Sequence, residues 1–541
     1  MNHDVLNQPP PLVDYNLFAT DRALRSSVAR EGAGWACAML DGFGAKVGSA
    51  EVIEWGVLAN QHPPVLHTHD RYGNRRDEVE FHPAWHNLMR MAVENRIHNL
   101  PWANPSSANP SSKDSRPGGH VARAAMAMIA SQNEAGHLCP ISMTYSALPV
   151  LRRDAALAEE WSPRILSSIY DASFRPAREK SGALIGMAMT EKQGGSDVRA
   201  NTTRASQIAG GEYAIDGHKW FCSAPMCDAF LVLAQAPRGL SCFLLPRWTP
   251  DGKRNGFELQ RLKSKLGNRS NASSEVEFRN AWATLIGEEG RGIATIIDMV
   301  HHTRLDCVMA SAALMRQALV QAMHHARHRS TFGKRLSDQP LMRNVLADLA
   351  IESEAATLLL MRLARAFDQG DHKFARIGVA IAKYWVAKRT VAHVAEALEC
   401  LGGNGFVEDS PMPRLYREAP LASIWEGSGN VIALDVLRAI AKEPEGLDRT
   451  LAEIRLAGDA RVERFVGGIR DYTREADARI AAERLALALQ ASLMIRFSPA
   501  PVVDAFCSSR LDGNWGHAFG TLRNVDIDSV IAVCDQVGDG T

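Results

Sequence analysis

No stretch of this sequence approaches the 18 consecutive apolar residues that a membrane-spanning helix needs. The first residues, Met1 to Val5, also lack the basic start and apolar stretch of a secretory signal. An excess of one charge is missing as well, because 61 Lys and Arg balance 61 Asp and Glu, which excludes attraction of the whole chain to a polyanion. These absences predict a cytoplasmic protein that binds no membrane.

Paired metal-binding motifs are absent too. The nine cysteines are scattered, and Cys222 and Cys227, the closest pair, have no second pair nearby that would complete a zinc site. Several cysteines lie in apolar runs, as expected for reduced, buried thiols. The histidine-rich stretch 62–86 is interrupted by Pro83, and its histidines are interpreted as packing or surface residues. We expect no bound metal.

Common catalytic signatures are also missing. Neither Gly-x-Gly-x-x-Gly nor Gly-x-x-x-x-Gly-Lys occurs, so the usual dinucleotide and P-loop phosphate sites are not indicated. There is no nucleophile elbow that would suggest hydrolysis.

The chain does have length, and its 541 residues are enough for several hydrophobic cores. Apolar residues three and four apart predict an N-terminal helical domain over residues 1–182, in which repeated Asn-Pro-Ser-Ser at 104–112 predicts an exposed loop. Short β-type runs divided by turn residues predict a β-barrel over 183–288. Long helical patterns predict a helical bundle over 289–444, and further helices predict an extension over 445–541.

A glycine-rich turn follows a predicted strand at residues 189–197, Met-Thr-Glu-Lys-Gln-Gly-Gly-Ser-Asp. Gly194 and Gly195 let backbone N–H groups approach a phosphate or a ring edge, because no Cβ stands in the way. The hydroxyls of Thr190 and Ser196 can donate to ligand oxygens. A plain hairpin loop explains the same residues equally well.

Two further segments suit a flavin. In the strand pattern 217–223, Trp220 and Phe221 stand beside Ser223, and an isoalloxazine ring needs an apolar flank and a donor near its polar edge. Arg329, at the end of the first long bundle helix, can pair bidentately with a pyrophosphate. The simpler alternatives are a core strand and a solvated basic helix end.

The densest constellation is Ile-Trp-Glu-Gly-Ser-Gly-Asn at residues 424–430. Here Glu426 precedes a glycine-rich turn that opens a helix. Its carboxylate therefore stands beside N–H groups that can hold a negatively polarised ligand atom.

These segments resemble the acyl-CoA dehydrogenase family. The resemblance lies in Thr-Glu-x-x-x-Gly-Ser-Asp at 190–197, Arg-x-x-Phe-Gly at 329–333, Gly-Gly-x-Gly at 402–405, and Glu426-Gly with Arg438 twelve residues beyond, in family order over roughly residues 80 to 440. Residues 265–272 and the C-terminal extension resemble, more narrowly, a bacterial branch of this family that belongs to the DNA alkylation response. This narrower resemblance extends over nearly the whole chain.

The resemblance implies a mainly α fold with a central β-barrel, a four-helix bundle and an extra helical domain, assembled as a homotetramer that shares FAD between subunits. It implies that Glu426 removes the α-proton of an acyl thioester while hydride passes to the flavin, and Thr303 before Arg304 disfavours the alternative base in the first bundle helix. The FAD contacts that it implies are Met187, Thr190, Gly194, Gly195, Ser196, Phe221, Cys222, Ser223, Arg329, Phe332, Trp425, Gly427, Ser428, Gly429, Asn430 and Arg438.

Four residues depart from the family pattern. Gln339 is shifted by one position and Glu399 replaces the usual glutamine, which weakens the expected contact with a neighbouring subunit's FAD. Phe221 replaces the usual tryptophan, and Trp425 replaces the usual tyrosine beside the base. A larger side chain there predicts a narrower acyl pocket.

Two functions therefore stand as hypotheses. The first is a flavoprotein of the DNA alkylation response that binds double-stranded DNA and has at most weak acyl-CoA dehydrogenase activity. The alternative is a fully active dehydrogenase that desaturates a branched or short acyl-CoA, without a role on DNA. Residues 441–541 hold 12 Lys and Arg against 16 Asp and Glu, a net charge of −4, and the interleaved arginines fit a solvated, salt-bridged helix as well as a phosphate-binding face.

Overall fold

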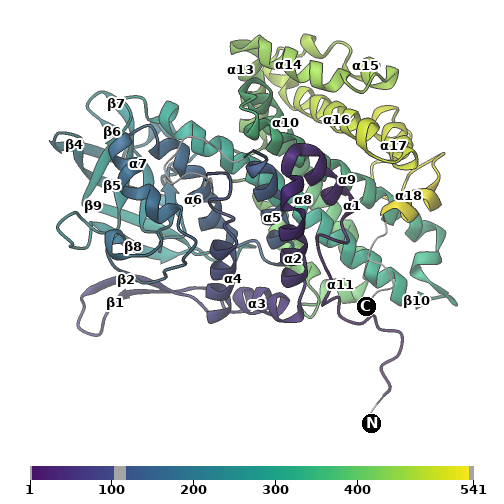
Figure 1. The fold of residues 1–541 in the computed structure, drawn as a ribbon, viewed down its shortest axis with the longest axis horizontal. Coiled ribbons are helices and arrows are strands. Elements are labelled where there is room, and N and C mark those ends of the chain that lie inside the picture. Colours follow the sequence, from purple (N-terminus) through teal and green to yellow (C-terminus); the bar gives the residue numbers. More distant parts are fainter. Residues whose placement is uncertain (1–2, 103–116, 535–541) are drawn as a thin grey trace. The chain divides into compact units, whose positions relative to one another are not determined.

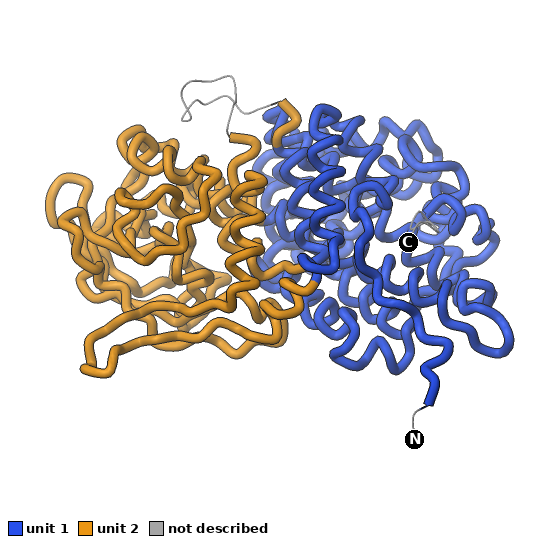
Figure 2. Tube along the Cα trace, turned by 60° about the horizontal axis from the view of Figure 1, so that its bottom comes forward, with its two compact units in different colours: residues 1–53, 120–133, 304–541 blue, residues 54–119, 134–303 orange. Residues whose placement is uncertain are grey.

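The computed structural model describes residues 3–102 and 117–534, and the chain divides into two compact units (Figure 2). One, called the helical unit here, consists of residues 1–53, 120–133 and 304–541. The other, the barrel unit, consists of residues 54–119 and 134–303. Each unit thus gathers segments that are far apart in the sequence. The predicted loop at 104–112 lies outside the described residues, and the predicted division into four domains stays a prediction.

The barrel unit is organised around a sheet whose strands pair in the order β3-β6-β4-β5-β9-β7, with β8 on β9 (Figure 1). Because β6 also pairs with β7, the path through β6, β4, β5, β9 and β7 returns to its start. Closure leaves these strands without a free edge, and it confirms the predicted β-barrel. The strands are β3 (Ile185–Ala188), β4 (Arg204–Ala209), β5 (Glu212–Ser223), β6 (Ala229–Ala236), β7 (Gly239–Pro246), β8 (Phe257–Leu262) and β9 (Ser273–Ile286).

The barrel core follows from the composition of these strands. β6 and β7 are almost continuously apolar and are buried along nearly their whole length, as in strands covered on both faces. Phe230 of β6 stacks on Phe257 of β8 with ring centroids 4.9 Å apart, and Phe243 of β7 meets Tyr213 of β5 edge to face at 5.0 Å. Aromatic packing therefore fills the interior and joins strands that are not hydrogen-bonded neighbours in the sheet.

A hairpin that the helical pattern of residues 1–182 does not predict precedes the barrel strands. Pro63 and Pro64 prevent the preceding helix from continuing, and the turn around Gly73 returns the chain, so that β1 (Val65–His69) pairs with β2 (Arg75–Glu80). The helices of this unit are α4 (Pro83–Glu94), α6 (Leu138–Leu151) and α7 (Ala155–Ile165).

The helical unit is built on the long helices that the sequence predicts: α8 (Gly292–His328), which begins in the barrel unit, α9 (Pro340–Asp368), α10 (His372–Cys400) and α13 (Gly429–Lys442) (Figure 1). The carboxylate of Asp371 caps α10 by accepting from the backbone N–H of Phe374, and Gly402, with a φ of +59°, ends it. Apolar side chains of α8, α9 and α10 share one core cluster. This unit confirms the predicted bundle.

The predicted C-terminal extension forms α14 (Pro444–Arg455), α15 (Ala460–Val466), α16 (Ala478–Phe497), α17 (Ala500–Phe506) and α18 (Ile527–Cys534). It is joined to α9 by buried ion pairs, since the guanidinium of Arg510 donates to Asp348 at 2.5 Å and to Glu352 at 2.8 Å. Burial alone would raise the pKa of the Glu352 carboxyl, but Arg389 and Arg510 lower it to about 2. The extension and the bundle therefore belong to one compact unit.

The remaining elements of the helical unit are short. They are α1 (Arg22–Val28), α2 (Cys37–Val47), α5 (Gly119–Asn133), α11 (Gly403–Phe406), α12 (Met412–Glu418), the hairpin strands β10 (Ser330–Thr331) and β11 (Lys334–Arg335), and α3 (Ala50–Gln61), which ends in the barrel unit. No helix in residues 3–102 and 117–534 is both long enough and apolar enough to cross a bilayer.

A fully buried histidine in α10 makes stability depend on pH. One ring nitrogen of His393, Nε2, lies 3.0 Å from the carbonyl oxygen of Leu349, and burial lowers the pKa of the imidazole to about 4. The unfolded chain binds this proton with a pKa near 6.5, so between these values it takes up more protons than the folded chain. We therefore expect acidification from about pH 7 to pH 4 to remove about 3 kcal/mol of stability through this residue.

Thermal unfolding of His393→Gln across this pH range measures the effect, with the exposed His69→Gln as control. The variant should lose less stability on acidification than the wild type. Parallel pH profiles for His393→Gln and wild type would contradict the assignment.

Candidate active site

Glu426 lies in a strained turn that leads into α13. The backbone φ is +58° at Glu426 and +105° at Gly427, so two successive residues occupy the left-handed region. Glycine tolerates this geometry, but a residue with a side chain pays about 1 to 3 kcal/mol for it. The turn therefore persists only if surrounding contacts hold it.

Those contacts are hydrogen bonds from two cationic side chains to three successive carbonyl oxygens. Nζ of Lys383 donates to the carbonyl oxygens of Trp425 at 2.8 Å and Gly427 at 2.5 Å. Nε of Arg304 donates to the carbonyl oxygen of Glu426 at 3.1 Å. Charge-assisted bonds of this kind are about twice as strong as neutral ones, so they offset the backbone strain.

An ion-pair cluster fixes the guanidinium of Arg304. Asp435 of α13 accepts from Arg304 at 2.8 Å and from both Nη atoms of Arg376 at 2.7 and 3.0 Å. Burial alone would raise the pKa of the Asp435 carboxyl, but the bonds from Arg376 and the charge of Arg304 lower it. Asp435 thus stays ionised and holds both arginines against α13.

Trp425 forms an apolar wall next to the base. It packs on a cluster of Cys307, Ala387 and Ala422, and its indole Nε1 is buried without a hydrogen-bond partner among the described residues. Burial raises the pKa of the Cys307 thiol to about 12, so this cysteine stays protonated and acts as a packing group.

The other predicted residues of this turn lie at the start of α13. Ser428 occupies the N-cap position without a capping bond from its side chain, and Asn430 is exposed. A Cβ on Gly429 would lie 2.8 Å from Cε of Lys388, so the end of this lysine side chain packs closely on the start of α13. Arg438 lies farther along the same helix and is exposed.

Arg329 and Phe332 lie around the β10–β11 hairpin. Nη1 of Arg329 donates to the carbonyl oxygen of Asn7 at 2.7 Å, a contact within the chain that the sequence did not predict. Phe332 is 99% exposed at the hairpin tip with a φ of +52°, a rare conformation for an aromatic residue. No contact in the described chain accounts for this exposed ring.

The barrel unit carries the other predicted residues, and a buried ion pair supports their turn. Glu191 is fully buried and accepts from Nζ of Lys219 at 2.8 Å, from the backbone N–H of Thr202 at 2.6 Å and from that of Thr203 at 3.1 Å. Lys219 also donates to the carbonyl oxygen of Leu233 at 2.8 Å. Burial lowers the pKa of the Lys219 ammonium to about 8, although Glu191 opposes the shift, while Lys219 lowers the pKa of Glu191 well below its ordinary value.

The outer side of the turn is open. No heavy atom lies within 4 Å of a Cβ built on Gly194, whose φ is +139°, and Ser196 is exposed. Gly195 has a different role, because a Cβ there would lie 2.4 Å from Oγ1 of Thr190. The amide of Gly194 donates to the carbonyl oxygen of Glu191 at 3.0 Å, so it is engaged within the turn. The open, glycine-lined outer side still has the shape that the polar edge of a flavin needs.

The strand residues offer an apolar flank and a hydroxyl. Phe221 of β5 is 49% exposed, the ammonium of Lys263 lies 4.6 Å from its ring centroid, and Ser223 and Met187 are half-buried. Cys222 is fully buried, and burial raises the pKa of its thiol to about 12, so only its main chain is available to a ligand. The flavin contacts of these residues stay a prediction.

Sequence patterns missed the buried lysines Lys219 and Lys383, which hold the two turns. A signal was present for Lys383, because it is a single charge in the apolar helical run 377–387, and such a charge inside a core needs specific partners. Which carbonyl oxygens it meets depends on tertiary structure that periodicity does not describe.

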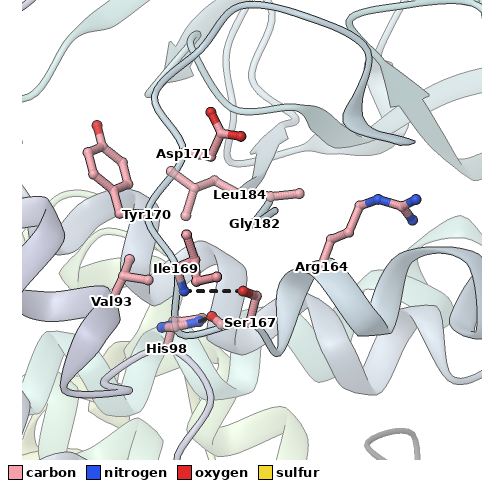
Figure 3. A pocket seen from close by; sticks show the side chains of 10 residues that line it. Val93, His98, Arg164, Ser167, Ile169, Tyr170, Asp171, Gly182 and Leu184 are labelled. Atoms are coloured by element: carbon pink, nitrogen blue, oxygen red, sulfur yellow. Dashed lines mark hydrogen bonds between the residues drawn. The ribbon is translucent and has the colours of Figure 1, made fainter. Parts of the chain in front are cut away.

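A recess of about 230 Å³, part of it open to solvent, lies elsewhere in the barrel unit (Figure 3). Its lining includes His98, Ser167, Tyr170 and Asp171, and Oγ of Ser167 accepts from the backbone N–H of Ile169 at 3.1 Å. None of the predicted flavin or catalytic residues lines it. Across the described chain, no group of three or more His, Cys, Asp or Glu side chains is placed to hold a metal ion.

Three family models match the chain. The AidB N-terminal domain, described as an adaptive response protein domain, matches residues 7–172, and the middle and C-terminal domains of acyl-CoA dehydrogenases match residues 186–281 and 290–441.

Individual proteins are similar over nearly the full length. A protein named AidB from Escherichia coli (strain K12) is 47% identical over 526 residues, which cover 95% of each chain. Acyl-CoA dehydrogenase family member 11 of Caenorhabditis elegans is 30% identical over 93% of this chain and 81% of its own. The crystal structure of Caenorhabditis elegans ACDH-11 in complex with C11-CoA has a TM-score of 0.81 at 25% identity and covers 99% of this chain and 95% of its own.

The Glu191–Lys219 pair generates a stability prediction. Glu191→Gln leaves the ammonium of Lys219 buried without a counter-charge, which should lower the free energy of unfolding by about 3 to 5 kcal/mol. Urea unfolding measures this loss, and the double variant Glu191→Gln/Lys219→Met should recover part of it. The exposed pair Arg455–Glu463 provides the control, since Glu463→Gln should leave stability nearly unchanged. Equal losses in Glu191→Gln and Glu463→Gln would show that burial of the pair is unimportant.

Proposed function

We propose a function from the premise that this chain belongs to the acyl-CoA dehydrogenase family, whose cofactor is FAD. In this proposal the protein oxidises an acyl-CoA thioester between Cα and Cβ, with Glu426 as the base. The observation that supports this most directly is the turn whose three successive carbonyl oxygens are held by Lys383 and Arg304. A strained backbone that is held by buried cations is typical of a side chain that must point in one direction.

The chemistry asks two things of Glu426. The α-proton of a thioester is weakly acidic, so the base must be ionised and close to it. The Lys383 ammonium interacts electrostatically with Glu426, which favours the carboxylate form. The proton passes to a carboxylate oxygen of Glu426, and the electron pair of the Cα–H bond forms the double bond as hydride leaves Cβ. Bound FAD supplies the hydride acceptor.

The residues proposed to hold FAD are those that the family pattern implies. In the barrel unit, the open turn at Gly194 and Ser196, the half-exposed ring of Phe221 and the hydroxyl of Ser223 have accessible groups of the kinds that a flavin needs. In the helical unit, the backbone N–H groups at the start of α13 suit a negatively polarised atom.

The proposed substrate class is a CoA thioester, and the turnover is proposed to be weak. The related ACDH-11 was crystallised in complex with C11-CoA, which supports an acyl-CoA as the ligand and supplies a practical probe. Trp425 occupies space beside the base and leaves less room for the acyl chain. A fully active dehydrogenase is the alternative, and the rate of flavin reduction distinguishes the two.

Anaerobic addition of C11-CoA to the FAD-loaded protein should bleach the flavin absorbance. Glu426→Gln keeps the size of the side chain but removes the base, so we expect bleaching at least about 100-fold slower. The control is Glu475→Gln in the extension, where the glutamate is exposed and should not affect the rate. Bleaching of Glu426→Gln at the wild-type rate would exclude Glu426 as the base.

We further propose a homotetramer in the cytoplasm. Phe332, Leu341 and Phe406 of the helical unit are between 81% and 99% exposed, and large apolar side chains of this kind are typical of protein interfaces. None of the nine cysteines, all of which lie in the described residues, forms a disulfide, which suits a reducing compartment.

A second proposed function is binding of double-stranded DNA in the alkylation response. It is supported by the full-length similarity to AidB and by the match of residues 7–172 to an adaptive response protein domain. Several arginines of the extension already pair with carboxylates. These pairs are Arg461–Asp459, Arg470–Asp448, Arg474–Asp477, Arg496–Glu453 and Arg510–Asp348. Phosphate contacts there must compete with these pairs, so we expect the affinity to be low.

Fluorescence anisotropy with a labelled duplex at about 50 to 200 mM salt tests DNA binding, because each phosphate contact adds to the salt dependence. Arg464 of the extension is 68% exposed and pairs only distantly with Asp512 at 3.9 Å. Arg464→Gln should therefore reduce the log–log salt slope by about 1, whereas the exposed barrel residue change Arg204→Gln should not. Absence of binding at low salt, or binding without a salt slope, would contradict this function.

A further inference from the structure

Lys383 is placed to set the direction of the Glu426 side chain. Its Nζ bridges the carbonyl oxygens of Trp425 and Gly427, one on each side of Glu426. The Trp425 carbonyl lies in the peptide plane that ends at the Glu426 Cα, and the Gly427 carbonyl lies in the plane that follows Gly427. Lys383 therefore holds both ends of the two left-handed residues, while Arg304 holds the Glu426 carbonyl between them. Because the backbone at Glu426 determines where its Cα–Cβ bond points, these contacts restrain the direction from which the carboxylate extends.

Lys383 is anchored in a helix that is itself held in place. It lies in the interior of α10, a helix of 29 residues that packs on α9, α13, α14 and α16. Farther along α10, Arg389 pairs with Glu352, and next to Lys383 the hydroxyl of Tyr384 accepts from Nε of Arg479 at 3.0 Å. The helix is therefore held on several sides, and Lys383 cannot move away without breaking its packing.

Packing alone does not explain a lysine at this position. Lys383 is only 1% exposed, and an apolar side chain of similar length would fill the same space without the desolvation of a charge. Burial lowers the pKa of this ammonium, although Cys307 and Glu426 oppose the shift. The ammonium supplies what an apolar residue lacks, namely donors for two main-chain carbonyl oxygens and a positive charge close to the base.

We propose that Lys383 is the positioning residue of the reaction, which fixes the Glu426 turn in its left-handed conformation and thereby aims the base at the substrate. This inference rests on the proposed function of Glu426 and deepens it.

Three substitutions separate the contributions of Lys383. Lys383→Met keeps the length and removes both donors and charge, Lys383→Gln keeps N–H donors without the charge, and Lys383→Arg keeps both. Lys373→Met on the same helix is the matched control, because Lys373 is exposed. Each variant is loaded with FAD and mixed anaerobically with C11-CoA, and the bleaching rate is followed against substrate concentration.

We expect the limiting rate of Lys383→Met to fall about 100-fold, because a small displacement of a catalytic group has an effect of this size. The concentration of C11-CoA at half-maximal rate should change little, since substrate binding is not what the lysine supports. Lys383→Arg should recover most of the rate, Lys383→Gln should lie between, and Lys373→Met should match the wild type. If Lys383→Met does not fold, a higher rate for Lys383→Arg than for Lys383→Gln is the expected result.

Hydrogen–deuterium exchange of the unliganded protein gives a readout that needs no turnover. Amides of residues 424–431 should exchange faster in Lys383→Met than in wild type, while peptides from β6 and β7 should be unchanged. Wild-type bleaching and wild-type exchange in Lys383→Met would overturn the proposal. Failure of the wild type itself to bleach would overturn the proposed function instead, and the exchange comparison would still decide whether Lys383 holds the turn.

Discussion

The hydrogen bonds from the Lys383 ammonium to the carbonyl oxygens of Trp425 and Gly427 are the constraint on which the helical unit's site depends. Without them two left-handed residues in succession would relax, because nothing in the local sequence favours that conformation at a glutamate. The constraint in turn requires a helix that holds its position. That requirement links the site to the extension, whose Arg510 pairs with the same Glu352 that binds Arg389 of α10.

The barrel unit also contains a buried lysine that holds a turn. Lys219 is buried in a barrel of apolar strands and donates to Glu191 and to the carbonyl oxygen of Leu233. Glu191 in turn accepts hydrogen bonds from the backbone N–H groups of Thr202 and Thr203. These bonds fix the glycine-rich turn on its buried side, while its outer face stays open. In both units a buried ammonium organises main-chain polar groups around a turn that cannot rely on regular secondary structure.

Much of the fold was predictable because its elements have strong local patterns. The long helices α8, α9, α10 and α13 follow from apolar spacing over many turns, and the barrel strands follow from short apolar runs between turn residues. The candidate residues around Glu426 were predicted from a carboxylate that precedes a glycine-rich turn at a helix start, and from the resemblance to the family. The β1–β2 hairpin was missed because its signal is short and lies in a helical region. The partners of Lys383, Lys219 and Arg329 were not predictable, since each contact joins segments that are distant in sequence.

In the proposed reaction, Glu426 is the positioned base that removes the α-proton. The most direct measurement is the exchange of the α-hydrogens of C11-CoA with D₂O in the presence of the FAD-loaded protein, followed by mass spectrometry. Exchange reports removal of the α-proton and its return from solvent, so it follows the action of the base directly. We expect deuterium at the α-carbon with the wild type and none with Glu426→Gln. Equal incorporation with both proteins, or none with the wild type, would contradict it.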